Sequence, residues 1–286
     1  MPVTHSTLEI VDLAHRQRRV LYTAERHIEA PNWSRDGQFL VVNGDGLLYR
    51  VPLDQPTLTA IATGFATRCN NDHGISPDGQ TLVVSHHDDA AGGGSILCTL
   101  PITGGTPQRV TTLAPSYWHG WSPDGRMLAF VAGRAAHADY KIYRLDLQTG
   151  QEQQLTFGPG LDDGPDYSPC GLFIYFNAFR DGRMQIWRMD ADGQHPQQVV
   201  HSAHSDWFPH PSPDGKHLVF IRYVEDQGQT HPFGRDVQLM LLHIDTGHVE
   251  ALTDVFYGGQ GTLNVPSWSP DGRALAFVSY RAPAAT

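Results

Sequence analysis

Histidines are the residues of this chain whose type and placement could do chemistry: there are 16 of them, against 20 lysines and arginines. His73 and His119 each lie three residues before a Ser-Pro-Asp-Gly segment, and His210 lies two residues before another. Imidazole titrates near neutral pH and, when neutral, binds transition metals. We therefore predict that His73 and His119 are acid–base residues. Alternatively, His73, His119 and His210 would be ligands of one divalent metal, manganese or calcium.

Polar and aromatic residues adjoin these histidines and extend the candidate site. Carboxylates and amides at matching places in the sequence are expected to orient the imidazoles and to bind a ligand: Asn71, Asp72, Asp163, Asp166, Asp206 and Asn264. Trp118 and Trp207 would stack against the C–H faces of a sugar. Four arginines would bind a carboxylate in bidentate fashion: Arg134, Arg180, Arg222 and Arg281. This composition favours a small polar or anionic ligand, with sugars and uronic acids fitting best.

Other interpretations of the same residues stay open. In one alternative, the arginines serve only to pair with loop carboxylates, which contributes about 0–1 kcal/mol for an exposed pair. Several histidines are expected to be solvated surface residues, namely His137, His195, His201, His231, His243 and His248. Two glycines, Gly74 and Gly120, follow His73 and His119 and are expected to leave room for a ligand.

A repeated turn must position these residues. A Ser-x-x-Gly segment occurs six times, at residues 34–37, 76–79, 122–125, 168–171, 212–215 and 269–272, with serines 42, 46, 46, 44 and 57 residues apart. Proline, aspartate and glycine in this order favour a hairpin turn. A β-like run follows each turn, for example residues 81–85 and 127–131, and two further short runs follow it. Four short antiparallel strands at this period are typical of a propeller blade.

The two ends of the chain predict how the ring closes. The last repeat stops near residue 281, after two strands, and residues 8–13 match the third strand of another repeat at 142–147. The N-terminal strands would then complete the last blade and remove an open sheet edge. We predict an all-β chain, with residues 1–286 forming a single six-bladed β-propeller domain of four-stranded antiparallel blades.

Composition excludes several functional classes. The net charge of −10 disfavours a nucleic-acid partner or an anionic membrane surface, and no apolar run approaches the roughly 20 residues of a membrane span. Residues 1–7 lack the pattern of a signal peptide, and Cys69, Cys98 and Cys170 form no disulfide framework. A cytoplasmic location is therefore expected, or a periplasmic one if the start of the chain is processed.

Residues 32–40 (NWSRDGQFL) and 267–277 (SWSPDGRALAF) resemble the blade repeat of the TolB propeller family, and the similarity covers nearly the whole chain. The resemblance implies the fold, but this repeat serves scaffolds, gating domains of peptidases and lyases of pectin fragments. Oligogalacturonate lyases pair a similar repeat with a histidine-rich, manganese-bearing channel mouth. Two functions follow. One is a propeller that binds a carbohydrate or uronate at the channel mouth, as a metal-assisted polysaccharide lyase or a glycoside hydrolase. The other is a non-catalytic scaffold that binds a protein partner.

Overall fold

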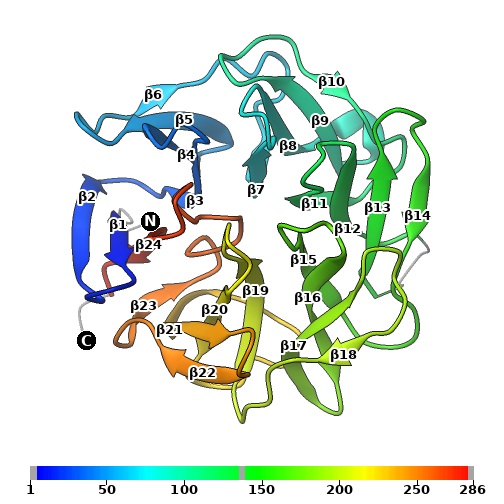
Figure 1. The fold of residues 1–286 in the computed structure, drawn as a ribbon. Helices are drawn as coiled ribbons and strands as arrows, with labels where there is room; N and C mark the ends of the chain where they lie inside the picture. Colours follow the sequence, from blue (N-terminus) through cyan, green and yellow to red (C-terminus); the bar gives the residue numbers. More distant parts are fainter. Residues whose placement is uncertain (1–4, 135–138, 283–286) are drawn as a thin grey trace.

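Six antiparallel β-sheets are arranged around a central axis like the blades of a propeller (Figure 1). The computed structural model describes residues 5–134 and 139–282. None of the helical segments in these two ranges is long and apolar enough to cross a bilayer. The only helix assigned in them is one short 3-10 turn, η1 (Asp89–Ala91).

Blades one to four each contain four strands that follow one another along the chain, the innermost strand first. Blade one contains β3 (Glu29–Trp33), β4 (Phe39–Gly44), β5 (Leu47–Pro52) and β6 (Thr59–Ala60). Blade two contains β7 (Cys69–Ile75), β8 (Thr81–His87), β9 (Ser95–Pro101) and β10 (Gln108–Arg109). Blade three contains β11 (Ser116–Trp121), β12 (Met127–Ala132), β13 (Lys141–Asp146) and β14 (Glu152–Gln154). Blade four contains β15 (Asp162–Tyr167), β16 (Phe173–Arg180), β17 (Arg183–Asp190) and β18 (Gln197–Gln198).

Blade five departs from this plan because its chain is longer. It contains β19 (Ser205–Pro211), β20 (His217–Tyr223), β21 (Phe233–His243) and β22 (His248–Ala251), and an extra strand, β23 (Phe256–Gly259), pairs with β21. The additional residues between the fifth and sixth turns therefore form the loop at residues 224–232 and strand β23.

Blade six is closed by both ends of the chain, as the sequence predicted. β24 (Ala274–Tyr280) pairs with β1 (Ser6–Asp12), and β1 pairs with β2 (Arg18–Ala24). A bridge between Trp268 and Leu275 joins the innermost segment to β24. In this way strands from the first and last parts of the sequence share one sheet.

The repeated turn is built as its residue types require. In blade two, Ser76 Oγ donates to Asp78 Oδ1 (2.5 Å) and accepts from the Thr81 amide (2.9 Å), while Gly79 adopts a φ of 73°. In blade one an arginine replaces the usual proline without loss of the turn. Arg35 instead donates to the carbonyls of Ile75 and Ser76 (3.2 and 3.3 Å), and so connects blade one to blade two.

An irregularity in the inner strands was not predicted. In β3, β7, β11, β15 and β19 the pairing register shifts in the middle of the strand. At three of these bulges a residue four positions before the turn serine has a positive φ: Ala30 (54°), Gly164 (59°) and Phe208 (53°). Bulges twist a strand and redirect its side chains, so side chains at these positions depart from the regular alternation of a strand.

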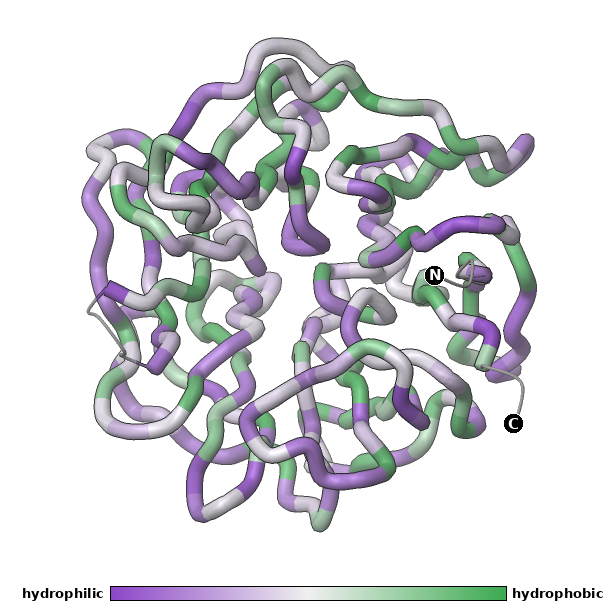
Figure 2. Tube along the Cα trace, turned by 180° about the vertical axis from the view of Figure 1, so that it is seen from behind, coloured by the Kyte–Doolittle hydropathy of each residue, from purple (hydrophilic) through white to green (hydrophobic). Residues whose placement is uncertain are grey.

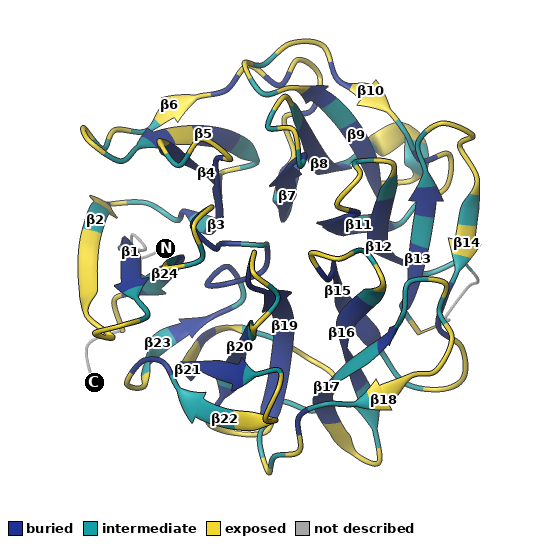
Figure 3. Ribbon diagram, in the orientation of Figure 1, coloured by how far each residue is buried: buried dark blue, intermediate teal, exposed yellow. Residues whose placement is uncertain are grey.

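Burial follows the distance from the axis. Inner strands are almost wholly buried, whereas the outermost strands, such as β6 and β10, are exposed (Figure 3). Between the blades lie tryptophans that directly precede the turn serine, Trp33, Trp121 and Trp268, which are at most 9% exposed, as expected of core residues. Hydrophilic stretches also reach the centre of the ring (Figure 2), and they include buried polar residues of the inner strands.

Candidate functional site

A pocket of about 560 Å³ lies at the end of the axis where the inner strands begin. Its lining comes from blades two to six: Asn70, Asp72, His87, Tyr117, His119, Val131, Tyr140, Leu161, Asp163, Phe208, Gln229, Thr230, His231, Pro232, Gln260 and Asn264. We call it the mouth pocket. Of the predicted site residues, it brings together Asp72, His119, Asp163 and Asn264.

His119 and Asp163 form the charged centre of the mouth pocket. His119 occupies the bulge of β11, and its Nε2 lies 3.2 Å from Oδ1 of Asp163, at the start of β15. Burial lowers the pKa of His119, but the charges of Asp72 and Asp163 outweigh burial and raise it above its usual value. Burial likewise opposes ionisation of Asp163, yet the bond from His119 leaves the pKa of that carboxyl below its usual value. The pair therefore favours an imidazolium and a carboxylate.

Asp72 is a second carboxyl with the opposite tendency. It is 6% exposed and lies in the bulge of β7, where Asn70 Nδ2 donates to its Oδ2 over 2.6 Å. Burial raises the pKa of Asp72 to about 7, because the charge of His119 offsets only part of the desolvation. Two carboxyls with pKa values pushed in opposite directions are characteristic of acid–base sites.

The structure adds residues that sequence analysis missed. His231 was predicted to be a solvated surface residue, but this was wrong. Its side chain is 24% exposed, its Nε2 lies 3.6 Å from Oδ2 of Asp163, and it lines the mouth pocket. The Phe208 ring packs against both imidazoles, at centroid distances of 5.9 Å from His119 and 5.1 Å from His231. The 57-residue spacing between the last two turn serines was the available signal, since the extra chain in blade five carries His231.

His73 and His210 lie outside the mouth pocket. His73 is fully buried with its Nε2 3.4 Å from the Val41 carbonyl, and burial lowers its pKa to about 4. His210 is also fully buried and lies between Oδ2 of Asp166 (3.0 Å) and the Leu263 carbonyl (3.1 Å). Asp166 lines a different hollow of about 260 Å³, which is bordered by the repeated turns and which we call the turn-side hollow.

The three histidines proposed as metal ligands thus have separate partners and do not converge on one point. In the ranges 5–134 and 139–282, no three His, Cys, Asp or Glu side chains are placed to share a metal ion. These three histidines therefore do not form one manganese or calcium centre in the described residues, and a divalent metal cofactor stays a prediction.

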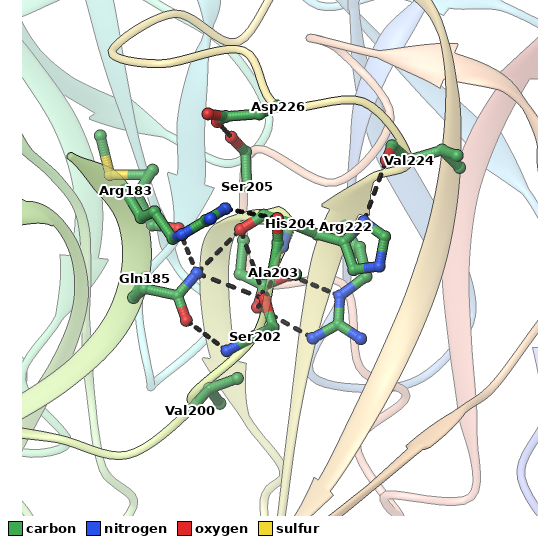
Figure 4. Close-up of polar contacts among 12 residues, drawn as sticks. Arg183, Gln185, Val200, Ser202, Ala203, His204, Ser205, Arg222, Val224 and Asp226 are labelled. Carbon is green, nitrogen blue, oxygen red and sulfur yellow. Dashed lines mark hydrogen bonds and ion pairs between the residues drawn. The ribbon is translucent and has the colours of Figure 1, made fainter.

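Three of the predicted arginines pair with carboxylates of the scaffold, and none of the four lines the mouth pocket. Arg134 pairs with Glu152 at 2.8 Å, and Arg180 pairs with Asp162 at 2.5 Å. Arg222 makes two hydrogen bonds to Asp206, of 2.7 and 2.9 Å, within a network that includes Ser202 and Gln185 (Figure 4). Asp206 is fully buried by this contact and does not line the mouth pocket.

Arg281 and Asn71 are likewise away from the mouth pocket lining. Arg281 is exposed near the end of the described chain, and its amide donates to the His5 carbonyl over 3.0 Å. Asn71 is buried and points its amide at Oε2 of Glu29 over 3.4 Å.

The tryptophans and glycines of the inner strands serve packing. Trp118 is 1% exposed and lines the turn-side hollow, and Trp207 is fully buried in a hydrophobic cluster. A Cβ on Gly74 would lie 1.9 Å from the Trp118 ring, and one on Gly120 would lie 2.8 Å from the Pro165 carbonyl. The expectation that these glycines leave room for a ligand was therefore wrong, because protein atoms fill both spaces.

Fold and site together define a six-bladed β-propeller with a ligand-sized pocket, in which a few charged side chains meet, at one end of its axis. The chain belongs to the TolB β-propeller family: the family profile described as "TolB beta propeller domain" matches residues 112–285.

Relatives support this assignment over most of the chain. A protein of Agrobacterium fabrum (strain C58) whose function is uncharacterized is 49% identical over 276 residues, which cover 96% of this chain and 92% of that protein. The Tol-Pal system protein TolB of Francisella tularensis subsp. mediasiatica (strain FSC147) is 28% identical over 211 residues. That match covers 71% of this chain and 44% of the relative, so the alignment spans less than half of that TolB protein.

Solved structures give the same result for the fold. The structure of a TolB-like protein from Agrobacterium tumefaciens is 46% identical, with a TM-score of 0.93, and the match covers 98% of this chain and 99% of that one. An oligogalacturonate lyase in complex with manganese is 17% identical, with a TM-score of 0.55, over 93% of this chain and 70% of the lyase. This second likeness concerns the fold alone.

Proposed function

We propose that the mouth pocket binds a small hydroxyl-rich molecule, of the size of a mono- or disaccharide. The observation that carries the proposal is the meeting of Asp72, His119 and Asp163 in one pocket of about 560 Å³. Pockets of this size hold small ligands, and a few convergent polar groups among apolar walls fix the orientation of the ligand. Tyr117 and Tyr140 supply the walls on which a sugar ring would stack, and Phe208 packs behind them against His119 and His231.

The same residues could act on the ligand as acid and base. Asp72 has the raised pKa of a general acid, and Asp163 remains a carboxylate beside the His119 imidazolium. Glycoside hydrolysis requires one protonated and one ionised carboxyl on either side of the scissile bond. A uronate lyase would instead need a cation for the substrate carboxylate, and the described lining contains no lysine or arginine. We therefore favour binding or hydrolysis of a glycoside over cleavage of a uronate.

The test is saturation-transfer NMR of the chain with a panel of neutral, amino and uronic mono- and disaccharides. We expect saturable binding of at least one sugar, which Tyr117→Ala and His119→Gln weaken by about tenfold or more. Asp54→Asn, on an exposed turn outside the lining, is the matched control and should leave binding unchanged. Absence of binding across the panel, or equal binding by wild type and the two pocket variants, would contradict the proposal.

A protein-binding scaffold is the second candidate, and the turn-side hollow favours it. Its rim carries exposed residues of the repeated turns, Arg35, Pro123, Pro169 and Pro213, which a partner could contact. Since a curated relative is named as a Tol-Pal system protein, Pal is the partner to test by size-exclusion co-elution. Co-elution that Pro169→Arg abolishes would support the scaffold, since blade one already has an arginine, Arg35, at this turn position, and separate elution would reject Pal as its partner.

A further inference from the structure

The mouth pocket has an unbalanced distribution of charge. Its described lining contains the carboxyls of Asp72 and Asp163 but neither lysine nor arginine. His119 is already paired with Asp163. Arg134 and Arg222 supply no free positive charge to the pocket, because each is paired with a carboxylate of the scaffold. An anionic ligand would therefore meet negative charge without a compensating cation.

Asp72 has an oxygen available to a ligand. The carboxyl lines the mouth pocket although the residue is only 6% exposed. Its Oδ2 accepts from Asn70 over 2.6 Å, while no residue in the described part of the chain donates to its Oδ1. A buried carboxylate is costly unless it is paired and hydrogen-bonded. A positively charged hydrogen-bond donor at Oδ1 would give the Asp72 carboxylate both a charge partner and a hydrogen bond.

Aromatic residues of the same pocket suit a cation. Tyr117 and Tyr140 lie edge to face, with centroids 5.9 Å apart, and the His87 ring lies 6.1 Å from Tyr117. All three line the mouth pocket with Asp72. The faces of phenol rings attract an ammonium group, and more strongly where the group is shielded from water. Carboxylate and aromatic faces thus favour the same kind of ligand.

We propose that the mouth pocket selects a ligand carrying a protonated amine, such as an amino sugar, with the ammonium bound by Asp72 and its aromatic neighbours. This inference rests on the proposed function, since it names the chemical class of the small molecule. Glu29 reinforces the preference: its charge, like that of Asp163, opposes ionisation of Asp72 until a cation arrives.

Isothermal titration at neutral pH with three matched disaccharides tests the inference. The probes are the β-1,4-linked dimer of glucosamine, its N,N′-diacetyl form, and digalacturonate. We expect the free amine to bind about tenfold or more tightly than the acetylated dimer, and digalacturonate to bind weakest. Asp72→Asn should remove the preference for the amine, and the control Asp54→Asn should retain it.

Each outcome discriminates. Equal or tighter binding of the acetylated dimer or digalacturonate overturns the amine preference and leaves the proposed function standing. Failure of all three probes also overturns it, and the broader NMR panel then decides separately whether any sugar binds. The comparison of probes on the wild-type chain is decisive by itself if Asp72→Asn does not fold.

Discussion

His119 of blade three and Asp163 of blade four face each other across a blade boundary, with Nε2 3.2 Å from Oδ1. His231, from the loop between β20 and β21, lies 3.6 Å from the other oxygen of the same carboxylate. One carboxylate therefore holds two imidazoles that are more than 100 residues apart in sequence. The arrangement exists only when blades three, four and five are assembled.

Replacing Asp163 with asparagine should lower the pKa of His119. At present the charges of Asp72 and Asp163 overcome the effect of burial, and loss of one of them shifts the balance toward the neutral imidazole. We expect the pKa of His119 to fall, because the variant removes one of the two charges that favour its imidazolium. Titration of the ¹⁵N imidazole signals gives the value directly. An unchanged pKa would show that Asp163 does not stabilise the imidazolium.

Asp72 should make the chain less stable as the pH rises toward neutrality. Its folded-state pKa of about 7 lies above the ordinary value of 3.8 for an aspartate, so its contribution is complete below about pH 4 and is lost as the pH rises through 7. Between pH 4 and 7 the free energy of unfolding should fall less in Asp72→Asn than in the wild type, and the two falls should differ by at most about 4 kcal/mol. Urea denaturation at a series of pH values measures the difference. Parallel curves for wild type and variant would contradict the prediction.

Gly74→Ala should destabilise the chain because of a close contact with Trp118. The added Cβ would lie 1.9 Å from the indole ring, and both residues belong to tightly packed inner strands. Overpacking of this kind costs about 1–3 kcal/mol. In a Trp118→Leu background the additional cost of Gly74→Ala should be smaller, which a double-mutant cycle by thermal or urea denaturation detects. Strictly additive effects would place the cause outside this contact.

Arg222→Ala should reduce stability without changing the affinity of the mouth pocket. It leaves the fully buried Asp206 carboxylate without its partner, which costs about 3–5 kcal/mol. The double variant Arg222→Met/Asp206→Asn should recover part of the loss, because no unpaired charge remains buried. Denaturation gives the stability and sugar titration the affinity. Loss of affinity in a variant of normal stability would instead make Arg222 a ligand-binding residue.

The fold was predictable because it depends on local chemistry that is repeated. Residues such as Ser76, Asp78 and Gly79 form each turn almost by themselves, so six copies reveal six blades. The closure of blade six was equally predictable. Residues 8–13 resemble a blade strand but precede the first repeat, and the last repeat stops two strands short of a full blade.

The site was only partly predictable because it depends on how neighbouring blades pack. Asp72, His119, Asp163 and Asn264 were found from their position before the repeated turn. The direction of each imidazole depends on the bulges of the inner strands, which the sequence did not predict. His119 lines the mouth pocket, whereas His210 contacts Asp166 and the Leu263 carbonyl. His231 was not predicted because it belongs to no repeat. The partners of Arg134, Arg180 and Arg222 depend on how the strands pack, which no local sequence pattern indicates.

The imidazole signals of His119 offer the most direct measurement, because this residue is at the centre of the mouth pocket and His210 is a buried internal reference. Both should be followed by ¹⁵N NMR while the sugar panel is titrated into the chain. If the mouth pocket binds small hydroxyl-rich ligands, at least one sugar shifts the His119 signals saturably and leaves those of His210 in place. If no sugar moves His119, or if both histidines shift alike, the mouth pocket is not the binding site.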